Sequence, residues 1–233
     1  MRVAADSELQ LVPSLEQARE LAKQGNVVPV RASVVDDTET PVSAFLKLRA
    51  GEPEGAPCFL LESAAQGQVG RYSFVGLRPR AILRWSDGTL SEWNGEEAAN
   101  GAGPSRSVEA PDPYAAVAER LAEFRPAPVE GLPPFAGGAV GFFGYDLVRT
   151  VEPLGKPNPD PLGLPDMALM VTDAMLAFDH LNHELTILAC AFAEPDGSID
   201  AAYERAAATI AEMRERLRAA VPVPAHPSVT EPP

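Results

Sequence analysis

The sequence predicts an α+β fold in which four or five helices pack on largely antiparallel sheets. Roughly eight to ten short, β-prone segments can be counted, and most follow one another across short turn-forming loops. Two of them flank Ser86-Asp87-Gly88-Thr89, and Asp-Gly in such a position is a strong hairpin signal. Strands joined in this way are antiparallel, whereas a doubly wound parallel sheet needs a helix between successive strands.

Length and composition favour a protein that binds a small molecule or another protein. The chain has 233 residues, 45% of them hydrophobic, which suffices for one large domain or two small ones. A net charge of −14 argues against nucleic acid and against an anionic membrane surface as partner. There is no run of about 18 apolar residues, and the first residues do not resemble a secretory signal. The two cysteines lie in apolar runs, so we expect a cytoplasmic protein with reduced, buried thiols.

The first helix is predicted over Leu11–Gly25. Ser14 caps its start with Gln17 three residues later, and the glycine ends it. A strand over Asn26–Val35 follows. Pro29 cannot donate a ladder hydrogen bond, which confines this strand to a sheet edge or places the proline at its start.

A second helix begins at Thr40-Pro41, because a threonine cap followed by proline favours a helix start, and it ends at Gly51. Two apolar strands come next, Pro57–Ser63 and Gly70–Gly76, joined by small residues. We call these two strands and their connection the hairpin segment.

Another hairpin is predicted from Arg80–Trp85 and Leu90–Asn94. The stretch that follows, Gly95–Glu109, is polar and glycine-rich, and we expect a mobile excursion there. Asp112-Pro113 then repeats the cap-plus-proline start. This third helix carries one apolar stripe, formed by Val117, Leu121 and Phe124, and we expect the stripe to pack on the core.

Leu132–Asp146 combines glycines with aromatic residues. The glycines do not form the dinucleotide pattern G-x-G-x-x-G, and no Walker lysine accompanies them, so phosphate binding is not favoured. Glycines in such a strand permit close approach by a neighbouring element. A short helix is expected over Tyr145–Val151.

The C-terminal part predicts a hairpin of Asp166–Phe178 with Glu184–Phe192, and a last helix over Ser198–Ala220. His180 and His183 lie in the turn of this hairpin. No thiol cluster and no helix aligns them, so we expect a solvated turn and not a metal site.

The pattern indicates one domain over residues 1–220, followed by a proline-rich linker or tail over Val221–Pro233. Because a linker normally leads to something, we expect the chain to stop short of a further domain.

Polar chemistry gathers in the hairpin segment. Glu62 and Ser63 close its first strand, and Arg71 and Ser73 interrupt the second. An acid, a basic or hydroxyl donor and an apolar wall are what binding of a free amino acid requires. Alternation along a strand lets all four converge only if the strand end bends or is bulged, and otherwise they form a solvated edge. Nucleophile-elbow, H-E-x-x-H and spaced-cysteine motifs are missing from the sequence.

Three motifs, in order along the chain, resemble the N-terminal region of anthranilate synthase component I. They are Thr40-Pro41-Val42-Ser43-Ala44-Phe45-Leu46-Lys47-Leu48, Leu60-Leu61-Glu62-Ser63 with Gly70-Arg71-Tyr72-Ser73-Phe74-Val75-Gly76, and Gly137-Gly138-Ala139-Val140-Gly141-Phe142-Phe143-Gly144-Tyr145-Asp146. The resemblance runs from about Val12 to Leu217. Its Leu-Leu-Glu-Ser form favours the anthranilate branch over the related aminodeoxychorismate synthase.

The resemblance implies the fold of that N-terminal region and a lyase reaction of the complete protein. Family members convert chorismate and ammonia, delivered from glutamine by a glutaminase subunit (component II), into anthranilate and pyruvate with Mg²⁺. The chorismate and magnesium sites belong to a C-terminal domain that we expect to be absent here. No catalytic residue, metal ligand or cofactor is therefore assigned to this chain, which we expect to be inactive alone.

The resemblance also implies a regulatory site. In the family, the Leu-Leu-Glu-Ser strand belongs to the pocket for the feedback inhibitor L-tryptophan. Leu61, Glu62 and Ser63 match that motif, and Arg71 and Ser73 lie on its partner strand. We therefore expect the tryptophan-sensing part of component I. The alternatives are a non-catalytic regulatory or interaction module, and the same region of aminodeoxychorismate synthase, which serves folate synthesis.

Overall fold

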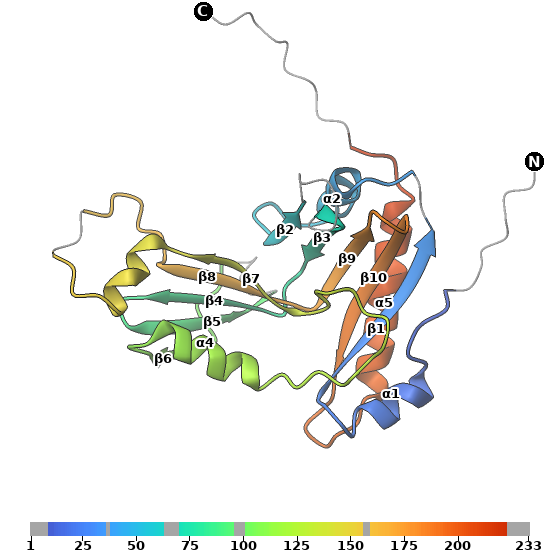
Figure 1. The fold of residues 1–233 in the computed structure, drawn as a ribbon, viewed down its shortest axis with the longest axis horizontal. Coiled ribbons are helices and arrows are strands. Elements are labelled where there is room, and N and C mark those ends of the chain that lie inside the picture. The colour runs from blue at the N-terminus through green and yellow to red at the C-terminus, as the bar shows by residue number, and fades with distance from the viewer. Residues whose placement is uncertain (1–8, 36–37, 63–69, 96–100, 156–158, 223–233) are drawn as a thin grey trace, which may run out of the picture.

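The protein contains two five-stranded antiparallel sheets, each with a helix against one face, which confirms the predicted α+β class (Figure 1). The structure is a computed structural model, and it describes residues 9–35, 38–62, 70–95, 101–155 and 159–222. Figure 1 shows the sheets side by side along the long axis of the molecule. Most of the predicted proline-rich tail, residues 223–233, lies outside the described residues.

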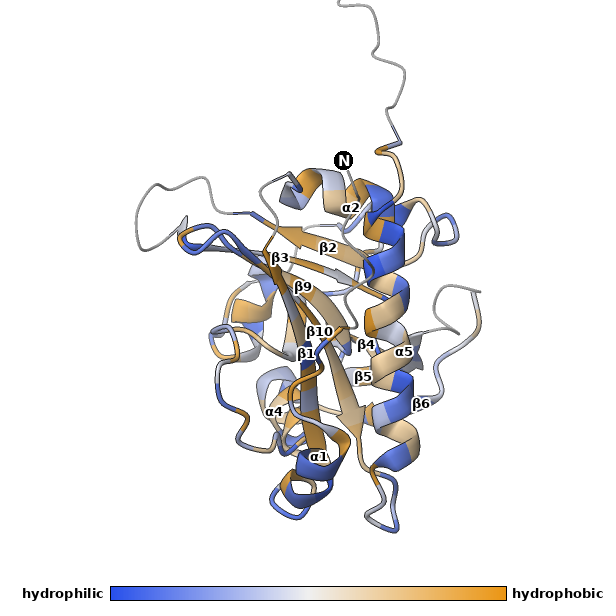
Figure 2. Ribbon diagram, turned by 90° about the vertical axis from the view of Figure 1, so that its right-hand side faces the viewer, coloured by the Kyte–Doolittle hydropathy of each residue, from blue (hydrophilic) through white to orange (hydrophobic). Residues whose placement is uncertain are grey.

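Sheet A holds the largest core. Its strands, in spatial order, are β1 (Val27–Val35), β10 (Glu184–Phe192), β9 (Ala174–Asp179), β3 (Tyr72–Leu77) and β2 (Cys58–Leu61). Its helices are α1 (Leu15–Leu21), α2 (Pro41–Arg49) and α5 (Asp200–Leu217). One apolar stripe of α5 is buried against the sheet at Tyr203, Ala206, Ile210 and Met213. Figure 2 accordingly shows hydrophobic colour along the strands and alternating hydrophilic and hydrophobic segments along α5.

Sheet B packs on a smaller core. Its strands, in spatial order, are β6 (Arg106–Glu109), β5 (Thr89–Asn94), β4 (Ala81–Ser86), β8 (Met167–Thr172) and β7 (Gly138–Phe143). The helices of this part are α4 (Pro113–Ala122) and the 3₁₀ helix η2 (Tyr145–Thr150). Val117 of α4 and Leu147 of η2 are buried in one cluster with β4 and β8.

The predicted helix starts are confirmed by their caps. Ser14 and Gln17 form a reciprocal capping box, Thr40 caps α2, and the Asp112 carboxylate accepts two backbone N–H bonds at the start of α4. The first helix is shorter than the predicted 11–25, because Val12 instead pairs with Arg31 of β1 in an isolated bridge.

Strand β1 is an edge strand, as Pro29 predicted. The Asp87-Gly88 hairpin is also confirmed, and both residues have a positive φ, 48° and 77°. Both cysteines are free; Cys190 is buried and Cys58 is half-buried.

Two predictions about strands were wrong. The expected excursion over 95–109 contains β6, an edge strand in which only Val108 is apolar, so its sequence carries no strand pattern. The single strand predicted over 166–178 is two strands in different sheets, β8 and β9, separated at Asp173. An apolar run shows that a segment is buried, but not that it changes sheets.

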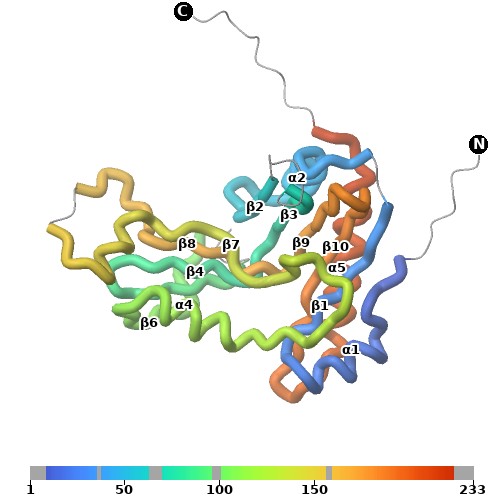
Figure 3. The backbone as a smooth tube through the Cα atoms, viewed as in Figure 1, coloured from blue at the N-terminus to red at the C-terminus, as the bar shows by residue number. Residues whose placement is uncertain are grey.

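Figure 3 shows how the sheets are joined: the chain passes from β3 to β4, and again from β8 to β9, at the same corner. Strand β3 thus has the connection of the hairpin segment at its start and the crossing between sheets at its end. No described helix combines the length and apolarity needed to cross a bilayer.

Gly141 lets β7 approach β8 closely, as its sequence setting predicted. A Cβ placed there would lie 2.0 Å from the carbonyl oxygen of Ala168, and a backbone atom cannot move aside. Gly141→Ala should therefore reduce the free energy of unfolding by about 2 to 3 kcal/mol, measured by urea denaturation.

Gly103→Ala is the matched control, because no atom lies within 4 Å of a Cβ at that position. It should change stability by less than about 0.5 kcal/mol. Equal changes in the free energy of unfolding for the two substitutions would contradict a close approach of β7 to β8 at Gly141.

Candidate functional site

The hairpin segment forms an antiparallel strand pair at the edge of sheet A. Leu61, the last residue of β2, lies opposite Phe74 of β3 and is 43% exposed. Glu62 follows it and is exposed. Ser63 and the connecting residues 64–69 lie outside the described residues. The exposed part of the candidate site therefore begins at Leu61 and Glu62.

Arg71 binds an acid that the sequence did not point to. Its guanidinium donates from Nε and Nη2 to the two carboxylate oxygens of Asp179, at 3.0 and 2.6 Å, and it also lies 4.9 Å from the ring centroid of Tyr72. Hydrogen bonding from Arg71 lowers the pKa of Asp179 to about 2, although partial burial opposes the shift.

Ser73 is fully buried, and its hydroxyl lies 2.7 Å from Nε2 of His180. The imidazole in turn stacks on Phe178, with ring centroids 6.4 Å apart. His180 was expected in a solvated turn. It is exposed, but it holds a hydrogen bond to the second strand of the hairpin segment.

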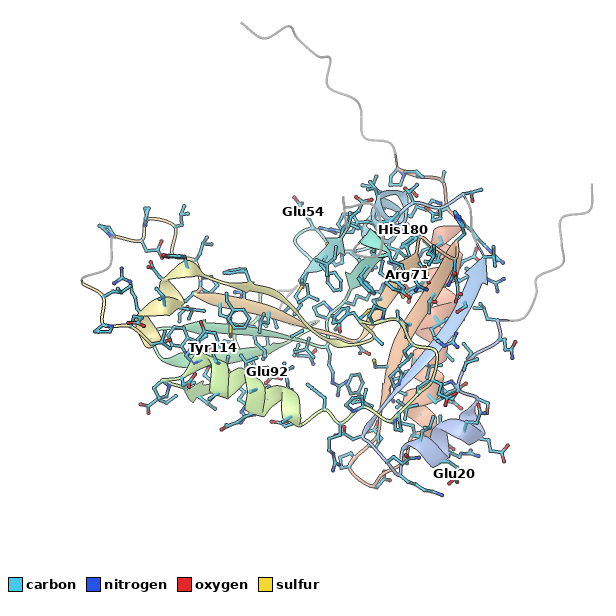
Figure 4. The ribbon with its side chains drawn as sticks, viewed as in Figure 1. Glu20, Glu54, Arg71, Glu92, Tyr114 and His180 are labelled. Atoms are coloured by element: carbon cyan, nitrogen blue, oxygen red, sulfur yellow. The ribbon has the colours of Figure 1, made fainter. Side chains whose placement is uncertain are left out.

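The five predicted residues therefore do not converge on one point. Arg71 and Ser73 contact the end of β9, near which Figure 4 labels Arg71 and His180. Leu61 lies on the opposite face, since it shares a cross-strand pair with Phe74 and side chains alternate along β3. Arg71 and Ser73 anchor the hairpin segment to its neighbour, and Leu61 and Glu62 are available for a ligand.

An aromatic wall stands on the Leu61 face. Tyr72 and Phe74 stack with centroids 6.2 Å apart, and Phe135 meets Phe74 edge-on at 5.5 Å. Among the described residues Glu62 has no hydrogen-bond or ion-pair partner. An exposed carboxylate can bind an ammonium, and an aromatic wall can contact an apolar ring.

The sequence missed Asp179 and His180 because strand pairing decides their role. Tyr72 pairs with Asp179 and Ser73 with Phe178, more than a hundred residues along the chain. The sequence did show polar residues at the end of a predicted strand. It did not show which other strand those residues would lie beside. Within the described parts of the chain, no three His, Cys, Asp or Glu side chains group as a metal site would require.

The ion pair of Arg71 with Asp179 should make part of the stability acid-sensitive. The folded pKa of Asp179, about 2, lies below its ordinary value of 3.8, so the pair stabilises the fold above pH ~4 and is lost as the pH falls through ~2. Because a third of the Arg71 side chain is exposed and solvent screens the pair, Arg71→Gln should lower the free energy of unfolding only slightly at neutral pH. Urea denaturation should show this difference shrinking toward pH 2.

Lys23→Gln serves as the control, since its pair with Glu20 is about two-thirds exposed on both sides. It should have almost no effect at either pH. A cost of Arg71→Gln that stays constant down to pH 2 would show that the charge pair contributes little.

Comparisons with known proteins give one consistent result. No protein-family model matches the chain. It is 37% identical over 223 residues to anthranilate synthase component 1 of Arthrobacter globiformis, covering 94% of this chain and 40% of the relative. It is 41% identical over 208 residues to the protein of the same name from Pseudomonas aeruginosa, covering 87% and 39%.

A solved structure, anthranilate synthase component I from Streptococcus pneumoniae TIGR4, is similar at 21% identity with a TM-score of 0.48. The similarity covers 81% of this chain and 37% of that one. The chain thus spans about 40% of the length of the curated relatives it matches. Over some nine-tenths of its residues, the chain is homologous to the N-terminal region of anthranilate synthase component I.

Proposed function

We propose that this chain is the N-terminal, tryptophan-sensing part of an anthranilate synthase component I that acts in tryptophan biosynthesis in the cytoplasm. The complete enzyme would convert chorismate and ammonia, released from glutamine by a component II glutaminase, into anthranilate and pyruvate. One observation carries the proposal: 37 to 41% identity, over 87 to 94% of the chain, to proteins that bear this name.

Catalysis is assigned to the part of the relatives that this chain does not match. The chain spans about 40% of their length, and its described residues offer no ligand set for the magnesium ion. No step is therefore derived through the metal. We propose that the 233-residue chain alone does not turn over chorismate.

The tryptophan half-site is proposed at the exposed end of the hairpin segment. The carboxylate of Glu62 would receive the α-ammonium, and Leu61 with the Tyr72–Phe74 wall would contact the indole. Ser63, which belongs to the same motif, would supply a hydroxyl. Arg71 binds Asp179 and Ser73 binds His180. These contacts would fix the position of the hairpin segment, so Arg71 and Ser73 act as positioning residues.

A surface suited to the remainder of component I lies on sheet B. Phe142 and Phe143 of β7 are 47% and 48% exposed, and the adjoining Tyr145 is 91% exposed. Strand β7 is also an edge strand, whose backbone groups can pair further. We propose that the rest of the full-length protein packs against this edge.

Tryptophan binding should depend on the hairpin segment. In titration calorimetry of the chain with L-tryptophan, Ser63→Leu and Glu62→Gln should each weaken binding about tenfold or more, because each removes a polar contact to the amino acid head group. Glu54→Gln removes one negative charge from another exposed site (Figure 4) and should leave the affinity unchanged. Binding that all three variants retain would dismiss this pocket.

A chimera tests the enzymatic part of the proposal. Replacing the matching region of the Pseudomonas aeruginosa component 1 with this chain should give an enzyme that forms anthranilate from chorismate, ammonium and Mg²⁺, read by fluorescence. The isolated chain should give no signal. A folded but inactive chimera would favour a non-catalytic module.

A further inference from the structure

A second polar site lies at the other end of β3, where the chain crosses between the sheets. A cavity of about 1180 Å³ opens there between the crossing segments, the end of β10 and one side of α5. It is lined by five arginines and five acids, which are Arg78, Arg80, Arg120, Arg205, Arg216, Glu52, Glu92, Asp173, Glu194 and Glu212. None of them belongs to the hairpin segment.

Eight of these ten charges neutralise one another. Glu52 and Glu212 both bind Arg78 and Arg216, Glu92 binds Arg120 at 2.6 Å, and Glu194 binds Arg205 at 2.7 Å. Arg78, Arg120 and Arg216 each donate to several oxygens in these pairs, whereas Arg205 donates one hydrogen bond, to Glu194.

Arg80 and Asp173 remain. The guanidinium of Arg80, an exposed residue, lies over Phe192, 3.9 Å from the ring centroid, and forms no ion pair with a described residue. Asp173, at the break between β8 and β9, is half-buried and forms none either. Burial raises the pKa of its carboxyl to about 6, while the charge of Arg80, a hydrogen bond from the backbone N–H of Cys190 and the charge of Arg205 oppose that shift. These two opposite charges thus share one cavity without meeting.

The walls around them are apolar and made mainly of small side chains. They are Leu77, Ala174, Ala189, Ala202, Ala206 and Met213, all less than 9% exposed. Four alanines in one wall leave room for the side chain of a ligand. An apolar wall beside a few convergent polar groups is the usual composition of a small-molecule site.

We propose that this cavity binds a free amino acid with an apolar side chain, its carboxylate on Arg80 and its ammonium on Asp173. A zwitterion separates its two charges by one carbon atom, so it can bridge an arginine and an acid that do not reach each other. It would give both groups an ion-pair partner at once, which neither a simple anion nor a simple amine does. The inference stands apart from the proposed function, because it uses neither the hairpin segment nor chorismate chemistry.

The test is titration calorimetry of the 233-residue chain at pH ~7.5, where Asp173 is ionised, with L-leucine, L-phenylalanine and L-methionine. L-Tryptophan is left out because it is the proposed ligand of the hairpin segment. At least one of the three should bind. Removing its ammonium (4-methylpentanoate for leucine) or its carboxylate (isoamylamine) should weaken binding about tenfold or more.

Arg80→Gln and Asp173→Asn should each weaken binding of the same amino acid by about tenfold or more. Circular dichroism checks that both variants fold. Arg205→Gln is the matched control: it removes a cation from the same cavity, but one that is already paired and 64% exposed. The affinity of the Arg205→Gln variant for the amino acid should stay within about twofold of that of the unchanged chain. Absence of binding by all three amino acids, or equal binding by the variants, would overturn the proposal.

Discussion

One buried carboxylate joins helix α5 to the crossing that follows β3. Glu52 is 5% exposed and accepts hydrogen bonds from Arg78, at the end of β3, and from Arg216 of α5. Burial raises the pKa of Glu52, but the two guanidinium groups outweigh it and hold the pKa below its ordinary value. An unpaired buried charge costs several kcal/mol, so helix α5 and the crossing are held to one another.

Strand β3 connects the two candidate ligand sites. It pairs with β2 on one side and β9 on the other, and the connection of the hairpin segment lies at its start and the cavity at its end. Between them, Val75 is fully buried and Gly76 has no side chain, because the ring of Phe59 occupies that space. The strand is therefore rigidly packed over its length. A ligand at either end meets a surface formed in advance by the core, which lowers the entropy cost of binding.

The polar residues of the hairpin segment divide into two groups. Glu62 carries its charge at the surface, where a ligand can use it, whereas Arg71 and Ser73 are bound by residues of a neighbouring strand. Side-chain type alone does not separate these groups, since an arginine and a serine suit a carboxylate ligand as well as they suit Asp179 and His180. The separation follows from which strand lies beside β3.

The sequence by itself determined what local interactions control. Ser14, Thr40 and Asp112 start their helices because a capping oxygen needs only neighbouring N–H groups, and Asp87-Gly88 turns because those residues accept a positive φ. Its motifs also identified the homology. Tertiary structure decided the rest: the division of one apolar run at Asp173, the polar edge strand β6, and the partners of Arg71 and Ser73. Each depends on pairing between residues far apart in the chain, and a local pattern carries no information about which distant segment will lie beside it.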